Sequence, residues 1–208
     1  SQFIDTWTDL TGRIGKRWPN WLVLNRLASH ATSIQDADVV LSQVGTIEQQ
    51  RQLLEEPDLV SPLVANLTQL LRDELNALKQ DWDLHWSVGE EKLGKDENWQ
   101  HLEPEQRNQL RAQQHLLETS APAISVEDTA AVLVTLDAHS IPSLRDRIAA
   151  MPGRFEQIAF GAAKLMEPQV QAVSLPGRTL KTETDVDAWL DESRALLLEK
   201  IRKGPVIV

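Results

Sequence analysis

The feature that most constrains this chain is a long apolar stripe in its first half. Between residues 63 and 86, large apolar side chains recur at steps of three and four, which places them on one face of an α-helix. Ser61 can cap this helix, Pro62 is tolerated at a first helical position, and Gly89 and Gly94 favour its end. The stripe lasts roughly seven turns, or about 40 Å at 1.5 Å per residue, which is typical of a bundle or coiled-coil-like helix. Its members are Leu63, Leu67, Leu70, Leu71, Leu75, Leu78, Trp82 and Trp86.

Shorter helical patterns lie on both sides of this stripe. Residues 3–17 are predicted to form one helix, which breaks at the Trp-Pro-Asn sequence of 18–20, and a second short helix follows through Leu22 and Leu27. Pro104 opens a further helix through Leu110 and Leu117, which we expect to pack back antiparallel on the long helix. Residues 1–119 are therefore predicted to be a helical unit built around a long antiparallel helix pair.

The second half has a different pattern after the Ser-Ala-Pro stretch at 120–122. A capping sequence opens one short helix near residue 128, and two more are expected at 143–151 and 154–166, separated by Pro152-Gly153. A β-type run at 170–176, a helix capped by Thr182 or Thr184, and a terminal Val-Ile-Val follow in the order of a βαβ unit. The helix is expected to bury Val186, Trp189, Leu190, Leu197 and Ile201.

Together these patterns predict a mostly α fold. The expected order is a helical-bundle or coiled-coil-like N-terminal part, then short helices, then a small βαβ-like C-terminal element. The second unit, residues 120–208, is expected to be an α+β subdomain in which residues 206–208 pair beside 170–175.

Charge and composition narrow the possible partners. The chain has 21 basic and 31 acidic residues and a net charge of −10, which argues against binding of nucleic acid or of an anionic membrane surface. It contains no cysteine, which fits a reducing cytoplasm, and no apolar run approaches the roughly 20 residues that cross a bilayer. Seven tryptophans are expected to act as large core fillers. Because the first residues already have a helical pattern, we expect a piece of a longer cytoplasmic protein.

The sequence contains one Gly-Lys pair, in the segment 12–18. A phosphate-binding loop needs a glycine five residues before that pair and a hydroxyl residue after it. Leu10 and Arg17 occupy those two positions, so the pair is interpreted as part of a basic helix face. No cofactor-binding residue is assigned.

The histidines give weak metal and catalytic patterns. Asp81 and His85 share a helix face at a spacing that can hold a metal ion, with Glu90 or Glu91 needed to complete the ligands. A solvated pair is the simpler interpretation, and no metal site is assigned.

Two further short segments contain residue types found in catalytic motifs but lack other residues that those motifs require. His101 and Glu103 have the spacing of a deaminase motif, but that zinc site also needs cysteines. Asp137, His139 and Ser140 supply the residue types of a triad without the glycine-flanked serine of a nucleophile elbow. No catalytic residue is assigned, and we expect that this chain is not an enzyme.

A winged-helix module is the alternative to be weighed. Three short helices followed by β-type residues have the element order of that DNA-binding fold. Its reading helix would be 154–166, in which Arg154 and Lys164 are the only basic residues. That is little positive charge for a recognition helix.

From Trp99 onwards the chain resembles a known family. The segments "AKLMEP" (163–168), "LPGRTLKTETDVDAWL" (175–190) and the terminal "GPVIV" (204–208) are similar to the C-terminal end of BrxC (PglY-like) proteins. These are large P-loop ATPases of BREX bacteriophage-resistance systems. The resemblance covers a little over half of the chain closely, and none of its motifs is catalytic.

The resemblance implies a much longer parent whose ATP and magnesium sites lie upstream of this segment. It also implies a role for this chain as a non-catalytic C-terminal domain for assembly or protein interaction. The expected partners are other BREX proteins or a second copy of the ATPase, with no cofactor in this segment and no membrane contact.

Overall fold

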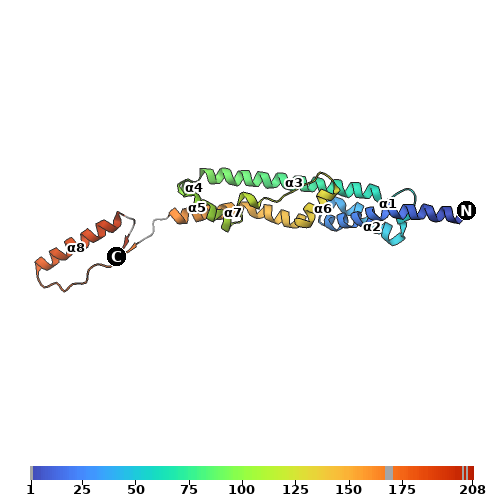
Figure 1. The fold of residues 1–208 in the computed structure, drawn as a ribbon. Coiled ribbons are helices and arrows are strands. Elements are labelled where there is room, and N and C mark those ends of the chain that lie inside the picture. The colour runs from blue at the N-terminus through green and yellow to red at the C-terminus, as the bar shows by residue number, and fades with distance from the viewer. Residues whose placement is uncertain (1, 167–170, 203, 205) are drawn as a thin grey trace.

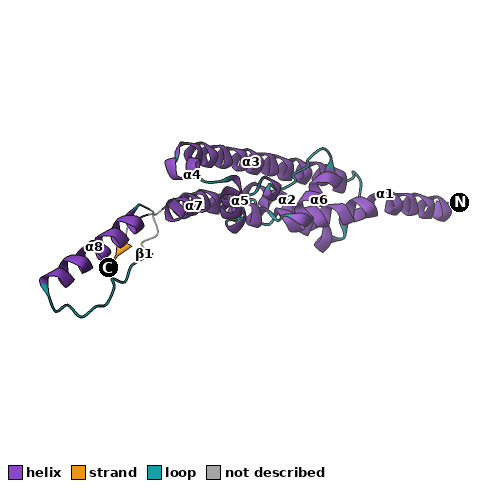
Figure 2. Ribbon diagram, turned by 60° about the vertical axis from the view of Figure 1, so that its left-hand side comes forward, coloured by secondary structure: helices purple, strands orange, loops and turns teal. Residues whose placement is uncertain are grey.

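The computed structural model describes residues 2–166, 171–202, 204 and 206–208 (Figure 1). The described residues are mostly helical, which confirms the mostly α class (Figure 2). The helices are α1 (Gln2–Ala31), α2 (Asp38–Gln50), α3 (Val60–Lys95), α4 (Glu97–His101), α5 (Pro104–Gln113), α6 (Thr129–Ala138), α7 (Ile141–Met166) and α8 (Glu183–Ile201), with single 3-10 turns at η1 (Gln35–Ala37), η2 (Gln52–Leu54) and η3 (Glu118–Ser120).

The 36-residue helix α3 is the central element of the fold. Its first half packs against α1, and its second half packs against α7 (Figure 1). Glu74 pairs with Arg145, and further along both helices Gly89 lies against Phe155, so α3 and α7 run parallel. The helix that begins at Pro104, α5, contacts both of these helices: Arg111 pairs with Glu90 on α3, and α5 also packs on α7.

Two predicted helix breaks do not occur. Helix α1 continues through Pro19, and α7 continues through Pro152. In α7 the buried side chains on the two sides of this proline, among them Ile148 and Phe155, keep one helical phase. Burial of that continuous face outweighs the roughly 3 kcal/mol cost of an interior proline. Because 143–151 and 154–166 form one helix, the three-helix order of a winged-helix module is not formed.

Both ends of α3 also differ from the prediction. Ser61 lies inside the helix, which begins at Val60, and the Asp58 carboxylate accepts hydrogen bonds from the N–H groups of both residues, at 3.4 and 2.9 Å respectively. The helix does not end at Gly89 or Gly94 but continues to Lys95. A Cβ atom at Gly89 would lie 2.2 Å from the Phe155 ring, so this glycine permits close packing of α3 on α7.

One apolar core runs across the expected boundary at residues 119 and 120. Helices α6 and α7, which follow that boundary, pack on α1 and α3, which precede it. The core therefore draws side chains from both sides of that boundary. The largest fully buried side chains of the core come from both halves and include Leu24, Leu67, Leu71, Leu75, Leu136, Leu144, Met151 and Ile158.

The prediction of a small βαβ-like C-terminal element is wrong. The extended pairing is reduced to two residues on each side, with Gln171–Ala172 (β1) parallel to Val206–Ile207 (β2), and it builds no sheet over a core. Val208 is 70% exposed, so the terminal segment is not a buried strand. Val170, the first residue of the expected strand, lies outside the described residues.

Candidate interaction surface

The first half of α1 carries large apolar side chains on its surface. Every residue from 2 to 9 is exposed, and Phe3 and Trp7 are 82% and 66% exposed. At 3.6 residues per turn the exposed apolar residues of this segment lie on one side of the helix. Figure 1 shows this end of α1 extending beyond the other helices. We call these residues the α1 stripe: Phe3, Ile4, Trp7, Ile14, Trp18 and Leu22.

The charged side chains of the same segment lie on the other side of the helix. Helical spacing places Thr8, Thr11 and Gly15 among or beside the members of the α1 stripe, so no charged residue interrupts it. The stripe is therefore suited to an uncharged, apolar partner surface and not to nucleic acid. The charged residues on the far side are Asp5, Asp9, Arg13, Lys16 and Arg17.

Arg17 fixes the back of α1 to the segment between α2 and α3. Its guanidinium donates to the backbone carbonyls of Leu53 at 3.1 Å and Glu55 at 2.5 Å, and to the Glu56 carboxylate at 2.7 Å. Arg13 adds a hydrogen bond to the Leu54 carbonyl at 3.2 Å. Arg17 is buried, and its contacts hold the charged side of α1 toward η2. The α1 stripe consequently faces away from the turn.

Asp58 links this anchor to the start of α3. Burial alone would raise the pKa of the Asp58 carboxyl, but hydrogen bonds from the Ser61 hydroxyl and the N–H groups of Val60 and Ser61, with the nearby charge of Arg17, outweigh it. The pKa of Asp58 is therefore held below its ordinary value of 3.8. Ionised Asp58 stabilises both the first turn of α3 and the position of α1.

Helix α8 presents a second exposed apolar face. Thr182 caps this helix as predicted, and its side chain and that of Asp185 form a reciprocal capping box. The Trp189 indole N–H donates to the Pro176 carbonyl at 2.7 Å, which ties the helix to the preceding loop. Leu190 and Ile201 are 52% and 53% exposed, so the expectation that they are buried is wrong. Val186 is likewise exposed, while Trp189 and Leu197 are half-buried.

The capping hydrogen bonds at the start of α8 also favour the ionised form of the Asp185 carboxyl. The backbone N–H of Lys181 and the hydroxyl and N–H of Thr182 all bond the Asp185 carboxylate, and they hold the pKa of that carboxyl below its ordinary value. An ionised Asp185 at the helix N-terminus favours the helix through its dipole.

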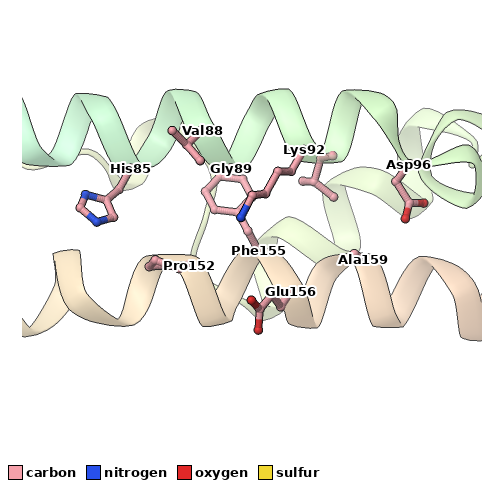
Figure 3. A pocket seen from close by; sticks show the side chains of 10 residues that line it. His85, Val88, Gly89, Lys92, Asp96, Pro152, Phe155, Glu156 and Ala159 are labelled. Carbon is pink, nitrogen blue, oxygen red and sulfur yellow. The ribbon is translucent and has the colours of Figure 1, made fainter.

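A groove of about 280 Å³ lies between α3 and α7 (Figure 3). Phe155 points from α7 toward Gly89 on α3, and Val88, Leu93 and Ala159 complete an apolar lining. His85, Lys92, Asp96 and Glu156 supply its polar lining. The groove follows from the close approach of the two helices at Gly89, and its apolar lining suits packing more than proton transfer.

The structure does not bring the predicted metal ligands together. The His85 ring hydrogen-bonds the backbone carbonyl of Asp81 at 2.8 Å, not its carboxylate. Glu90 forms a two-point pair with Arg111, and Glu91 pairs with Lys95 at 2.5 Å. Among the described residues, no group of three potential metal ligands lies together.

The Gly15-Lys16 pair, and Asp137 and Ser140 of the triad-like set, are also part of the helical framework. Gly15 and Lys16 lie inside α1, so their backbone is helical and does not form a phosphate loop. Asp137 binds Arg26 at 2.5 Å and His30 at 3.0 Å, both on α1, and so joins α6 to α1. The Ser140 hydroxyl accepts from the N–H of Ser143 at the start of α7.

His101 and Glu103 are used at helix ends. The His101 ring hydrogen-bonds the Glu97 carbonyl at 2.7 Å, and Glu103 forms a capping box with Gln106 at the start of α5. These contacts are structural in character.

Sequence reasoning missed the α1 stripe. The tryptophans were expected to be core fillers, yet Trp7 and Trp18 are exposed while Trp82 and Trp99 are buried. The signal was present in the spacing of four, seven and four residues from Phe3 to Trp18. Spacing identifies a shared helix face but does not show whether another element covers it.

Within the part of the chain that the structure describes, no helix combines the length and apolarity needed to span a bilayer. Comparison of the chain with family models, curated proteins and solved structures finds no match.

Proposed function

We propose that this chain is a non-catalytic domain for assembly and protein interaction. The observation that carries the proposal is the α1 stripe, a contiguous set of large apolar side chains that includes two exposed tryptophans. Exposed apolar patches larger than a few hundred Å² are rare on monomeric soluble proteins and mark interaction sites. Tryptophan is also enriched among residues that dominate binding energy.

The arrangement of the titratable residues supports the same proposal. Arg17, Glu90 and Asp137 serve ion pairs between elements, and Asp58 and Asp185 serve helix starts. These groups stabilise the fold, whereas the α1 stripe has no such role within the described residues.

The family resemblance gives the proposed setting. On that basis the chain is the C-terminal region of a BREX phage-defence ATPase in the cytoplasm, and it connects the ATPase to other BREX proteins or to a second copy. ATP and magnesium would be bound by the upstream part of that parent.

Co-purification tests the proposal. The tagged chain is co-expressed with each other component of the same BREX system, beside a Trp7→Glu variant and a Val134→Glu control that adds the same charge on α6. We expect the native chain and the control to retain a BREX component or an untagged second copy, and the stripe variant to lose it. Retention of neither by the native chain, or hydrolysis of Mg-ATP by the purified chain, would overturn the proposal.

A further inference from the structure

The α1 stripe also indicates which surface covers it. We propose that residues 3–18 of α1 pair antiparallel with the same residues of a second copy of this chain, around a two-fold axis between Leu10 and Thr11. The inference rests on the proposed function and names the partner of its interaction surface.

The first argument is that this stretch is a poor helix on its own. Residues 2–15 read QFIDTWTDLTGRIG, and most of them are β-branched, aromatic, aspartate or glycine residues of low helix propensity. Residues 2–9 are all exposed, so packing within the chain supplies little stabilisation there. Helical stability in proteins comes mainly from burial of one face. The face available for burial is the α1 stripe.

The second argument is that the stripe is complementary to itself when its direction is reversed. Antiparallel pairing about Leu10 and Thr11 sets Trp7 opposite Ile14 of the second copy and Phe3 opposite Trp18. Each tryptophan then faces a smaller side chain, and both halves of the interface are identical, as two-fold symmetry requires. Small residues at Thr8, Thr11 and Gly15 leave room for close approach of the two helices.

The third argument is the size of the surface. The five large apolar side chains within residues 3–18 are about half to four-fifths exposed and present on the order of 700 Å² in each copy. A standard stable interface buries roughly that area from each partner. No charged side chain of residues 3–22 lies on this face, so two copies meet without burying an unpaired charge.

Sedimentation equilibrium is the first test. The native chain is expected to change from 23.4 kDa toward twice that mass as its concentration rises into the micromolar range. Trp7→Glu and Ile14→Glu are each expected to weaken the dimer by at least about 30-fold, since each change acts twice in a symmetric interface. Val134→Glu and Phe160→Glu, on exposed apolar residues of α6 and α7, should leave the dimer unchanged. Circular dichroism confirms that every variant remains folded.

Cysteine cross-linking tests the direction of pairing. The chain has no cysteine, so a single introduced thiol reports only on itself. Thr11→Cys, beside the axis, is expected to form a disulfide dimer under mild oxidation. Ile4→Cys is not, because antiparallel pairing separates the two residues 4 by roughly 20 Å along the helix. Parallel, in-register pairing would place each residue opposite itself, so both variants would form the disulfide. A disulfide dimer of Ile4→Cys would therefore overturn the proposal.

Failure of this inference is distinguishable from failure of the proposed function. A native chain that remains monomeric at several hundred micromolar, or a dimer that Trp7→Glu leaves intact, overturns the self-association. If such a chain still retains another BREX component through the stripe, the interaction function stands. If it retains none and remains monomeric, both fall.

Discussion

Helix α3 and the first half of α1 carry the same kind of sequence pattern with opposite outcomes. Both have large apolar residues at helical spacing, including tryptophans. On α3, Leu67, Leu71 and Leu75 are fully buried because α1 and α7 cover them in turn. On α1, Phe3 and Trp7 are exposed.

The difference shows that periodicity and burial are separate properties. Periodicity is local and follows from 3.6 residues per turn, whereas burial depends on which elements the chain returns to that face. A stripe that the chain itself covers contributes to folding stability. A stripe that it leaves exposed can contribute to stability only when a partner binds and buries it.

The largest expected effect lies on the covered stripe. Leu71→Ala should lower the free energy of unfolding by about 2–5 kcal/mol, because it removes buried methyl groups and leaves a cavity. Guanidinium denaturation measures the change, with Val134→Ala as a control at an exposed apolar residue of α6. A loss below about 1 kcal/mol would contradict the packing of α1 and α7 on α3.

The next effect concerns the anchor between the two helices. Arg17→Ala should cost about 1–3 kcal/mol, because the Leu53 and Glu55 carbonyls lose a buried donor. Arg13→Ala, at a more exposed arginine on the same side of α1, is the matched control and should cost less. If both variants unfold at the same denaturant concentration, the buried contacts of Arg17 contribute nothing beyond those of its neighbour.

Two glycines of α3 sharpen the comparison within a single helix. Gly89→Ala should destabilise the chain by about 1–3 kcal/mol, since its Cβ would overlap the Phe155 ring. Gly94→Ala meets no atom within 4 Å and should stabilise the helix by roughly 0.5–1 kcal/mol. Thermal unfolding of the two variants should therefore shift in opposite directions, and equal shifts would contradict the close approach of α3 and α7.

Asp58 gives a smaller, pH-dependent effect. The pKa of its carboxyl is lower in the folded than in the unfolded chain, so its contribution is complete above about pH 4 and is lost as the pH falls through the folded value. Asp58→Ala should cost about 1 kcal/mol at pH 7, a value kept modest because its side chain is 35% exposed. Denaturation at pH 7 and pH 3 should show that the difference between native chain and variant shrinks in acid. A difference that does not change with pH would contradict this role.

The smallest effect is expected on the exposed stripe. Trp7→Ala should change the unfolding free energy of the dilute monomer by less than about 0.5 kcal/mol, as surface substitutions usually do. Chemical denaturation at low and high protein concentration separates this intrinsic effect from any loss of association. A cost of several kcal/mol in the dilute chain would show that Trp7 packs within its own chain.

The sequence predicted the parts of the fold that depend on local pattern. The Leu63–Trp82 face of α3 and the Thr182 cap of α8 follow from helical spacing and capping chemistry, and the structure confirms both. Pro19 and Pro152 were interpreted as breaks because their local cost is large. Both helices nevertheless continue through their prolines. For Pro152, packing on both sides reverses the outcome, and packing is not a local property.

The α1 stripe and the C-terminal segment also show that a local sequence pattern does not determine which residues are packed by the rest of the chain. The spacing from Phe3 to Trp18 was visible in the sequence, but which residues remain uncovered depends on where α2 and η2 place the chain. At the other end, valines and a well-capped helix favoured a small sheet. The structure pairs only Gln171–Ala172 with Val206–Ile207, so β-propensity near a helix did not suffice to build a sheet.

The unbroken course of α3 has a mechanical consequence. Its 36 residues rise roughly 54 Å without a kinking proline in the interior, and α1 and α7 brace its two halves along that length. Such an element acts as a stiff spacer: whatever binds near the η2 end is kept about 50 Å from whatever meets the α4 end. A displacement imposed at one end would be transmitted to the other as a lever transmits it, with little of the movement absorbed between.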